Sequence, residues 1–149
     1  MKISTQTRYA VRLLTELSNS DEQNTPTTLH YIAEKQGISE NYLDSIATKL
    51  RKAGYLKSYK GYGGGYCLSR NIEDISLGEI MRLMESTYYQ VHCVGDAEDS
   101  CVNYNDCLIA DALELLEKQI DDMVNNLRLS QLTDKANTAK KAVTTRKSR

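Results

Sequence analysis

The sequence predicts a mainly α-helical protein that has one small β-hairpin and a long helix near its C-terminus. Three observations predict this fold class. Apolar residues recur at helical spacing in five separate segments of the chain. Two short alternating segments flank a cluster of four glycines, Gly61 and residues 63–65. An apolar residue also stands at every third or fourth position from Ile109 to Leu127.

The first three helices follow from apolar spacing and from their end signals. The segment 5–18 places Tyr9, Ala10, Leu13, Leu14 and Leu17 on one face. A polar stretch that holds the only proline follows it and predicts a surface connection. Two further helices are expected over 29–36 and 40–53, the second with Ser39 as its N-cap. Each ends at a glycine, Gly37 or Gly54, which suits the left-handed position after a helix.

The two helices joined by Gly-Ile-Ser describe a helix-turn-helix, for which the commoner alternative is a plain helical hairpin. Residues 55–59 and 66–69 alternate like strands, so they predict a β-hairpin directly after it. A phosphate-binding loop would also use the glycines between them. That loop needs a helix after its last glycine, with a lysine and a serine or threonine. Since Gly65 is followed by a strand, a winged helix-turn-helix is predicted.

The C-terminal half contains one more short helix and one long one. Ser76 and Glu79 form a capping box that opens a helix over 77–86. Residues 87–106 show no periodicity, and a long helix is expected from about Cys107 to Ser130. Its seam spans three heptads and predicts pairing with the same helix of a second copy, or else packing on the protein's own core. The seam residues are Ile109, Leu113, Leu116, Ile120, Met123 and Leu127.

The chain therefore divides into four parts. Residues 1–86 form the winged helix-turn-helix domain, 87–106 a loop with cysteines, 107–131 the dimerisation helix, and 132–149 a basic tail expected to be disordered. The start of the chain lacks the pattern of a signal peptide. No apolar run approaches the ~20 residues that a membrane span needs. A cytoplasmic protein without membrane contact is expected.

A helix-turn-helix places the N-terminal residues of its second helix against base edges in the major groove. Here those residues are Glu40, Asn41, Tyr42, Asp44 and Ser45. An asparagine can pair with adenine, and an aspartate can accept from the amine of cytosine. The alternative for each is a solvated side chain, and Tyr42 could instead be half-buried because it lies one turn before Ile46.

Charge supports a polyanionic partner, although the formal net charge is −1. The stretch from Ser45 to Ile72 contains six basic residues and no acidic residue. Contacts to phosphate are expected from Lys49, Arg51, Lys52, Lys57 and Lys60. At the tip of the hairpin, the contacts are expected from Lys60, Gly61, Tyr62, Gly63 and Gly64, where glycines let the backbone approach a duplex closely.

Three of the four cysteines, Cys93, Cys101 and Cys107, fall within fifteen residues. In a cytoplasmic protein such a group is more typical of metal binding or of redox chemistry than of structural disulfides. Thiolates are soft ligands that suit zinc or an iron–sulfur cluster, and metal-free thiol redox sensing is the other option. Cys67 stands apart in the second strand and is expected to be a small buried apolar residue without a chemical role.

Together these segments resemble the IscR/NsrR/CymR family of bacterial dimeric winged-helix transcription regulators. The resemblance covers residues 1–130 and rests on TRYAVRLL, on IAEKQGISENYLDSIATKLRKAGYLKS, on KGYGGGYCLS and on the three cysteines. It implies that Asn41, Tyr42 and Asp44 read bases, that Lys60 to Gly64 contact DNA, and that the last helix makes the dimer. The chain departs from the family where Asp44 replaces a common Glu and Tyr62 replaces a common Pro.

The resemblance also implies that the three cysteines bind a [2Fe–2S] or [4Fe–4S] cluster with a fourth ligand that is not cysteine. Some relatives carry a His three residues after the last cysteine, where this chain has Ala110, and others a carboxylate at position 8, where it has Arg8. The remaining candidates for the fourth ligand are His92, Asp106 and Asp111. Asp111 is a candidate because it lies four residues after Cys107 in the expected helix.

The expected function is that of a homodimeric repressor that binds a pseudo-palindromic duplex operator under the control of the cysteine loop. Two alternatives come from other classes, a small thiol oxidoreductase and an adaptor for other proteins. The sequence lacks a Cys-x-x-Cys pair, and neither His30 nor His92 stands in a recognisable nucleophile arrangement. The chain is therefore not expected to be an enzyme.

Overall fold

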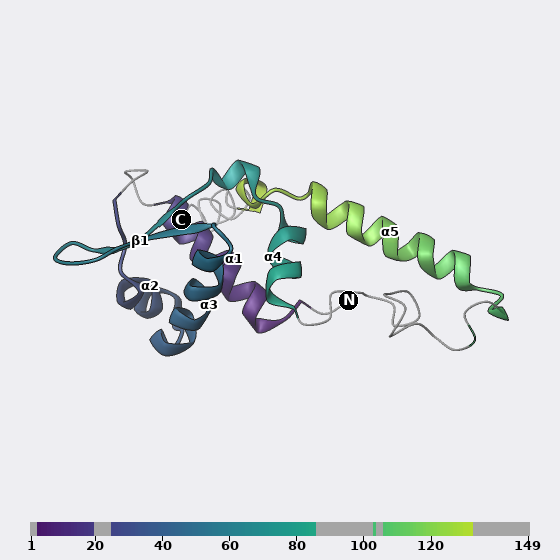
Figure 1. Cartoon of the computed structure of the whole chain (residues 1–149), viewed down its shortest axis with the longest axis horizontal. Helices are drawn as coiled ribbons and strands as arrows, with labels where there is room; N and C mark the ends of the chain where they lie inside the picture. Colours follow the sequence, from purple (N-terminus) through teal and green to yellow (C-terminus); the bar gives the residue numbers. More distant parts are fainter. Residues whose placement is uncertain (1–2, 20–24, 86–102, 104–105, 133–149) are drawn as a thin grey trace, which may run out of the picture.

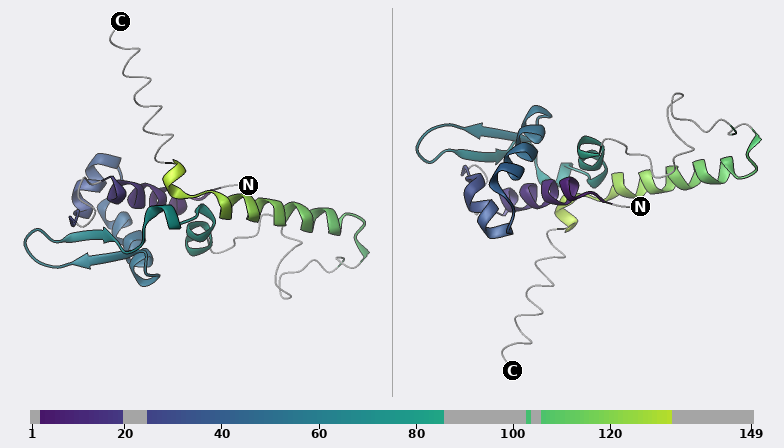
Figure 2. Two further views of the ribbon diagram at one scale, coloured as in Figure 1. Left: turned by 90° about the horizontal axis from the view of Figure 1, so that it is seen from above. Right: turned by 90° about the horizontal axis from the view of Figure 1, so that it is seen from below.

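The structure is a computed structural model that describes residues 3–19, 25–85, 103 and 106–132. Helices α1 to α4 gather into one body, while the hairpin and the long helix α5 extend from opposite ends of it (Figure 1). Both views in Figure 2 show the same arrangement. The predicted fold class, mainly helical with one small hairpin, is confirmed. The elements are α1 (Thr5–Ser18), α2 (Leu29–Gln36), α3 (Glu40–Lys52), β1 (Leu56–Tyr59), β2 (Gly65–Leu68), the 3-10 turn η1 (Ile72–Asp74), α4 (Leu77–Met84) and α5 (Ala110–Asn126).

The ends of the first helices follow the signals in the sequence. The Ser4 hydroxyl accepts from the Thr7 amide at 3.1 Å and caps α1, and the Thr28 hydroxyl accepts from the Tyr31 amide at 3.3 Å and caps α2. Gly37 ends α2 with a φ of 64°, which a residue with a Cβ rarely adopts. Ser39 occupies the N-cap position of α3 as expected, but its side chain makes no capping hydrogen bond.

One hydrophobic core unites the four helices of the body. Helix α1 contributes a fully buried stripe, and α3 lays its own apolar face against it. Helices α2 and α4 close the core on either side of this pair. The largest fully buried apolar side chains of these helices are Leu13, Leu14, Ile32, Leu43, Ile46, Leu50, Ile80 and Met81.

The hairpin is an antiparallel pair in which Leu56 faces Leu68 and Tyr59 faces Gly65. A third segment, which the sequence predicted only as a surface connection, pairs with its second strand. The Thr27 amide donates to the Tyr66 carbonyl at 3.0 Å, and the Tyr66 amide donates to the Thr27 carbonyl at 2.9 Å. A Cβ at Gly65 would collide with the Thr27 backbone, so this position requires glycine. The wing is thus attached to the segment before α2.

The long helix ends earlier than the periodicity predicts. Helix α5 stops at Asn126, and the backbone of Leu127 is extended before a further helical turn over 129–132. The break has a tertiary cause. The Leu77 amide donates to the Leu127 carbonyl and the Leu129 amide donates to the Ile75 carbonyl, both at 2.9 Å. This short pairing anchors the end of α5 beside the start of α4, with Leu129 fully buried.

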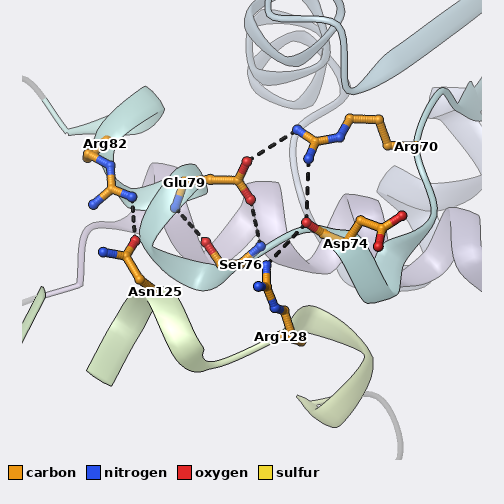
Figure 3. A network of polar contacts seen from close by, with 7 residues as sticks. All are labelled: Arg70, Asp74, Ser76, Glu79, Arg82, Asn125 and Arg128. Carbon is orange, nitrogen blue, oxygen red and sulfur yellow. Dashed lines mark hydrogen bonds and ion pairs between the residues drawn. The ribbon is translucent and has the colours of Figure 1, made fainter. Parts of the chain in front are cut away.

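Polar side chains reinforce the junction of α4 and α5 (Figure 3). Arg82 of α4 donates to the Asp121 carboxylate at 2.8 Å and also to the Asn125 side chain. Gly78 lies directly against Val124 and Asn125, where a Cβ would have no room. The C-terminal end of α5 is therefore fixed to the body, while its N-terminal end lies far from it (Figure 1).

Candidate nucleic-acid interface and cysteine segment

Helix α3 buries one face and exposes the other along its whole length. Leu43, Ile46, Ala47 and Leu50 are buried against the core. The predicted base-reading residues Asn41, Asp44 and Ser45 are all exposed on the outer face near the start of the helix. The Ser45 hydroxyl donates to the Tyr42 carbonyl at 2.8 Å, so it is partly occupied within the helix.

Tyr42 belongs to the packed side of α3. It is half-buried and packs edge-on against Tyr9 of α1, with the ring centroids 5.8 Å apart and the planes at 78°. The Arg12 guanidinium covers the Tyr9 ring at 5.8 Å from its centroid. The structure thus gives Tyr42 the half-buried position that the sequence left open as the alternative to base reading.

The predicted phosphate-contacting residues lie toward the end of α3 and along the wing. Lys49, Arg51 and Lys52 are exposed in the last turns of α3, where positive charge also suits the negative end of the helix dipole. The Lys49 amine donates to the Gln6 side chain at 3.2 Å, which directs it toward α1. Lys57 and Lys60 are exposed on the wing.

The tip of the wing is a tight glycine turn. The Gly64 amide donates to the Gly61 carbonyl at 2.9 Å, and Gly61 and Gly63 have φ of 97° and 75°. Both values lie in the region that glycine favours, which explains the glycine cluster without a bound nucleotide. Tyr62 is completely exposed at the tip, as predicted from the sequence.

Sequence reasoning missed one contact at the start of α3. His30 of α2 places its Nδ1 3.0 Å from a carboxylate oxygen of Glu40, the first residue of α3. Its Nε2 lies 3.7 Å from the Glu34 carboxylate. The hydrogen bond to Glu40 and the charge of Glu34 raise the pKa of His30 above its ordinary value. Only the pair at spacing four was visible as a pattern, because Glu40 is ten residues away in the chain.

The cysteine segment is described only at its end. Cys93, Cys101 and His92 lie outside the described residues. Cys107 is exposed and precedes α5, and the Ala110 amide donates to its carbonyl at 3.2 Å. Asp106 and Asp111 are also exposed. Because Cys107 stands before the helix, the helical spacing that favoured Asp111 as a ligand does not apply. Within the described part of the chain, no group of three metal-ligating side chains comes together.

Cys67 lies in the core, as predicted. It is 5% exposed in β2. Burial raises the pKa of its thiol, with the nearby Lys57 acting in the opposite direction. A thiol with a raised pKa is a poor nucleophile at neutral pH, so its environment supports packing rather than chemistry.

Helix α5 exposes apolar side chains along its outer surface. Of the predicted seam, Ile109, Leu116 and Met123 are 58%, 45% and 55% exposed, and Leu113, Ile120 and Leu127 are partly buried. Leu108 and Leu115 extend the surface and are more than half exposed. An apolar surface of this extent is typical of a contact with another protein chain.

A groove of about 550 Å³ lies between α1 and the residues that follow α5. Its walls include Ile3, Val11, Leu127 and Leu132, and Arg8 and Arg12 contribute to its lining. No carboxylate belongs to the described lining. The groove is therefore apolar with a positive edge. Separately, none of the described helices has the length and apolar content that crossing a bilayer requires.

Comparison with known proteins identifies this architecture. The family model Rrf2, described as an iron-dependent transcriptional regulator, matches residues 3–135. The regulator IscR of Vibrio campbellii is 34% identical over 132 residues, which cover 89% of this chain and 77% of that protein.

Solved structures agree. The structure of T. potens IscR has a TM-score of 0.70 at 31% identity. The match covers 93% of this chain and 90% of the IscR chain. CymR, the global cysteine regulator of B. subtilis, has a TM-score of 0.68 at 28% identity. The match covers 90% of this chain and 97% of the CymR chain. The Vibrio campbellii relative is described as an HTH-type transcriptional regulator, and the relatives are transcriptional regulators, not enzymes. The chain belongs to the Rrf2 family of winged-helix transcription regulators.

Proposed function

We propose that the chain works in the cytoplasm as a homodimer that represses transcription by binding a pseudo-palindromic duplex operator. The observation that carries this proposal is that the start of α3 and the basic wing are both exposed. Asn41 and Asp44 would read base edges, and Ser45 would contact the duplex beside them. Tyr42 would support the reading helix from behind through its contact with Tyr9. Repression would follow from occupancy, because a protein bound at a promoter excludes other proteins.

Phosphate contacts would come from Lys49, Arg51 and Lys52 of α3 and from the wing, with Lys60, Gly61, Tyr62, Gly63 and Gly64 at or near its tip. Each lysine or arginine that neutralises a phosphate releases counterions, so affinity falls as salt rises. Removing three such contacts with Lys49→Ala, Arg51→Ala and Lys60→Ala together is expected to reduce the slope of log K against log salt by roughly 3.

The test measures duplex-DNA affinity at several salt concentrations by fluorescence anisotropy. Lys118→Ala is the matched control, because it removes one exposed positive charge on α5, away from α3 and the wing. The control is expected to keep the parent slope. A triple variant that bound as tightly and as salt-dependently as the parent would show that the basic stretch is not the DNA surface.

A second part of the proposal concerns the dimer. The exposed apolar surface of α5 would pack against the same helix of a second copy, giving a two-fold symmetric pair. The groove lined by Arg8 and Arg12 would take up part of the partner's α5. The charges are complementary, since α5 carries five carboxylates and one lysine. Two-fold symmetry would present two reading helices to the two halves of a pseudo-palindrome.

A third part concerns the cofactor. Three thiolates from Cys93, Cys101 and Cys107 form a donor set of the kind that holds iron–sulfur clusters, and the fourth ligand would be His92, Asp106 or Asp111. Such a cluster, when bound, supplies an iron centre that responds to oxidants and to small ligands. Cys107 precedes α5, and α5 is fixed to the body at its far end, so a change at Cys107 would alter the placement of the reading helices. A coupling of ~1–3 kcal/mol would change operator affinity about 5- to 150-fold.

The direct test is anaerobic purification followed by absorbance and by iron and sulfide analysis. Iron and sulfide bound by the parent, and lost in Cys107→Ser, are the expected result. Protein that stayed colourless and iron-free after anaerobic reconstitution would contradict the cluster while leaving DNA binding intact. Thiol titration before and after oxidation would then test the metal-free alternative, in which the same cysteines switch by forming a disulfide.

A further inference from the structure

The contact between His30 and Glu40 joins the two helices of the helix-turn-helix at the point closest to the reading residues. Glu40 is the first residue of α3 and directly precedes Asn41. The His30, Glu34 and Glu40 side chains are 67%, 72% and 54% exposed, so solvent reaches all three. The contact therefore lies at the surface that the proposed function turns toward DNA.

We infer that His30 is a positioning residue for DNA binding, whose protonated ring neutralises Glu40 at the reading end of α3, so that binding takes up a proton and weakens as pH rises. The inference rests on the proposed placement of α3 against DNA.

The charges around His30 explain why its protonated form favours DNA binding. Glu34 on α2 and Glu40 on α3 face the imidazole, and Asp44 adds a third exposed carboxylate one turn further along α3. The one lysine of α2, Lys35, is already paired with Glu16 at 2.6 Å. A cluster of carboxylates opposes the approach of a phosphate backbone. In the described structure, a protonated His30 is the positive charge that contacts both Glu34 and Glu40.

The direction of the pH effect follows from the proton balance. The hydrogen bond from Glu40, supported by the charge of Glu34, already raises the pKa of His30 in the free protein. Nearby phosphates would raise it further in the complex. A group whose pKa is higher in the bound state takes up a proton on binding, so affinity falls as pH rises through the two pKa values. A difference of one unit between free and bound protein would change the dissociation constant about tenfold.

The experiment measures the dissociation constant of the full chain, kept anaerobic, for a duplex that the chain itself enriches from random-sequence DNA. Fluorescence anisotropy is recorded from pH 5.5 to 8.5 at constant ionic strength. For the parent, the dissociation constant is expected to rise ~3- to 10-fold across this range. His30→Gln is expected to bind as the parent does at pH 8.5 and to show a flat profile.

Glu40→Gln is the second variant, because it removes the charge that His30 neutralises. It is expected to move the pH dependence to lower pH and to bind more tightly than the parent at pH 8.5. Lys118→Gln removes a positive charge from α5 instead and is expected to keep the parent profile. Proton NMR of the imidazole gives an independent readout, since the chain has 2 histidines and His30→Gln assigns the signal. The pKa of His30 is expected to fall in Glu40→Gln and to rise when DNA is bound.

The inference is overturned if His30→Gln keeps the pH slope of the parent, or if DNA leaves the pKa of His30 unchanged. A parent chain that binds no duplex at any pH would instead overturn the proposed function. The two failures are thus distinguishable in one set of measurements.

Discussion

Neighbouring residues at the start of α3 have different surroundings. Asn41 is exposed, whereas Tyr42 packs its ring against Tyr9. A helix turns 100° per residue, so consecutive side chains face different directions. The family resemblance implies that both residues read bases; the structure exposes Asn41 and leaves Tyr42 half-buried against Tyr9.

Tyr42 tests this distinction. Tyr42→Phe keeps the ring and is expected to change neither the free energy of unfolding nor the DNA sequence preference measurably. Tyr42→Ala leaves a gap beside Tyr9 and is expected to destabilise by about 2–3 kcal/mol, less than for a fully buried ring. Asn41→Ala is expected to leave stability unchanged and to lose about 1–3 kcal/mol of base discrimination. Urea unfolding and selection from random DNA measure the two effects. Loss of sequence preference in Tyr42→Phe would restore Tyr42 as a base reader.

Helix α4 is held at both of its ends by carboxylates. At its start, Glu79 accepts from the Ser76 amide at 2.8 Å and from Arg70 at 3.2 Å. At its end, Glu85 accepts from the buried Thr7 hydroxyl at 2.6 Å and from the Ser4 amide at 3.1 Å. Burial raises the pKa of each glutamate, but these hydrogen bonds outweigh it, and both pKa values lie below the ordinary one.

The lowered pKa values predict an acid-sensitive fold. A carboxyl group whose pKa is lower in the folded state stabilises the protein above its ordinary pKa of about 4.5. That stability is lost as pH falls through the lower, folded pKa. Glu85→Gln is expected to cost about 1–2 kcal/mol at pH 7 and to make the loss of stability in acid smaller. Urea unfolding at pH 7 and pH 3.5 measures this, with the exposed Glu73→Gln as control. An unchanged acid response in Glu85→Gln would contradict it.

The wing depends on two kinds of glycine. Gly61 has a φ of 97° with open space around it, so Gly61→Ala is expected to cost only the backbone strain, about 1 kcal/mol. At Gly65 a methyl group would also collide with the Thr27 backbone and separate the wing from its third segment. Gly65→Ala is expected to cost roughly 2–3 kcal/mol more in urea unfolding. Equal costs at the two positions would mean that the contact with Thr27 does not stabilise the wing.

In the whole molecule, α5 is the element whose apolar surface the body of the same chain leaves exposed to solvent. Its C-terminal end is fixed by Gly78, Arg82 and the pairing at Leu127, while its exposed apolar surface runs away from the body (Figure 1). Exposed leucines along a projecting helix are unfavourable in water at about 25 cal/mol per Å². A second copy would remove this surface from solvent.

The proposed dimer contact through α5 can be tested with substitutions at two nearby positions of the helix. Leu116→Asp places a charge in the exposed apolar surface and is expected to shift the chain to a monomer in analytical ultracentrifugation. Its affinity for a two-half-site duplex is expected to fall at least tenfold, because the two reading heads would bind separately. Lys118→Asp introduces the same residue about 200° around the helix and is expected to stay dimeric. A dimer in both variants would place the interface elsewhere.

The local structure of this protein can be predicted from its sequence. Apolar spacing, Gly37, Gly54 and the Ser76–Glu79 capping box mark the helices of the body, because these signals act within one or two turns. The same holds for the wing, whose glycines identify the turn, and for the family, whose motifs are continuous stretches.

The tertiary structure alone decided what depends on contacts between distant segments. It ends α5 at Asn126, because the backbone of Leu127 and Leu129 pairs with Leu77 and Ile75 around the start of α4, some fifty positions away in the chain. It packs Tyr42 against Tyr9, joins Thr27 to the wing and places His30 beside Glu40. No periodicity encodes these pairs, since each requires two separately formed elements to meet. The geometry of the surface around α3 and the wing is therefore a property of the packed fold and not of any one segment.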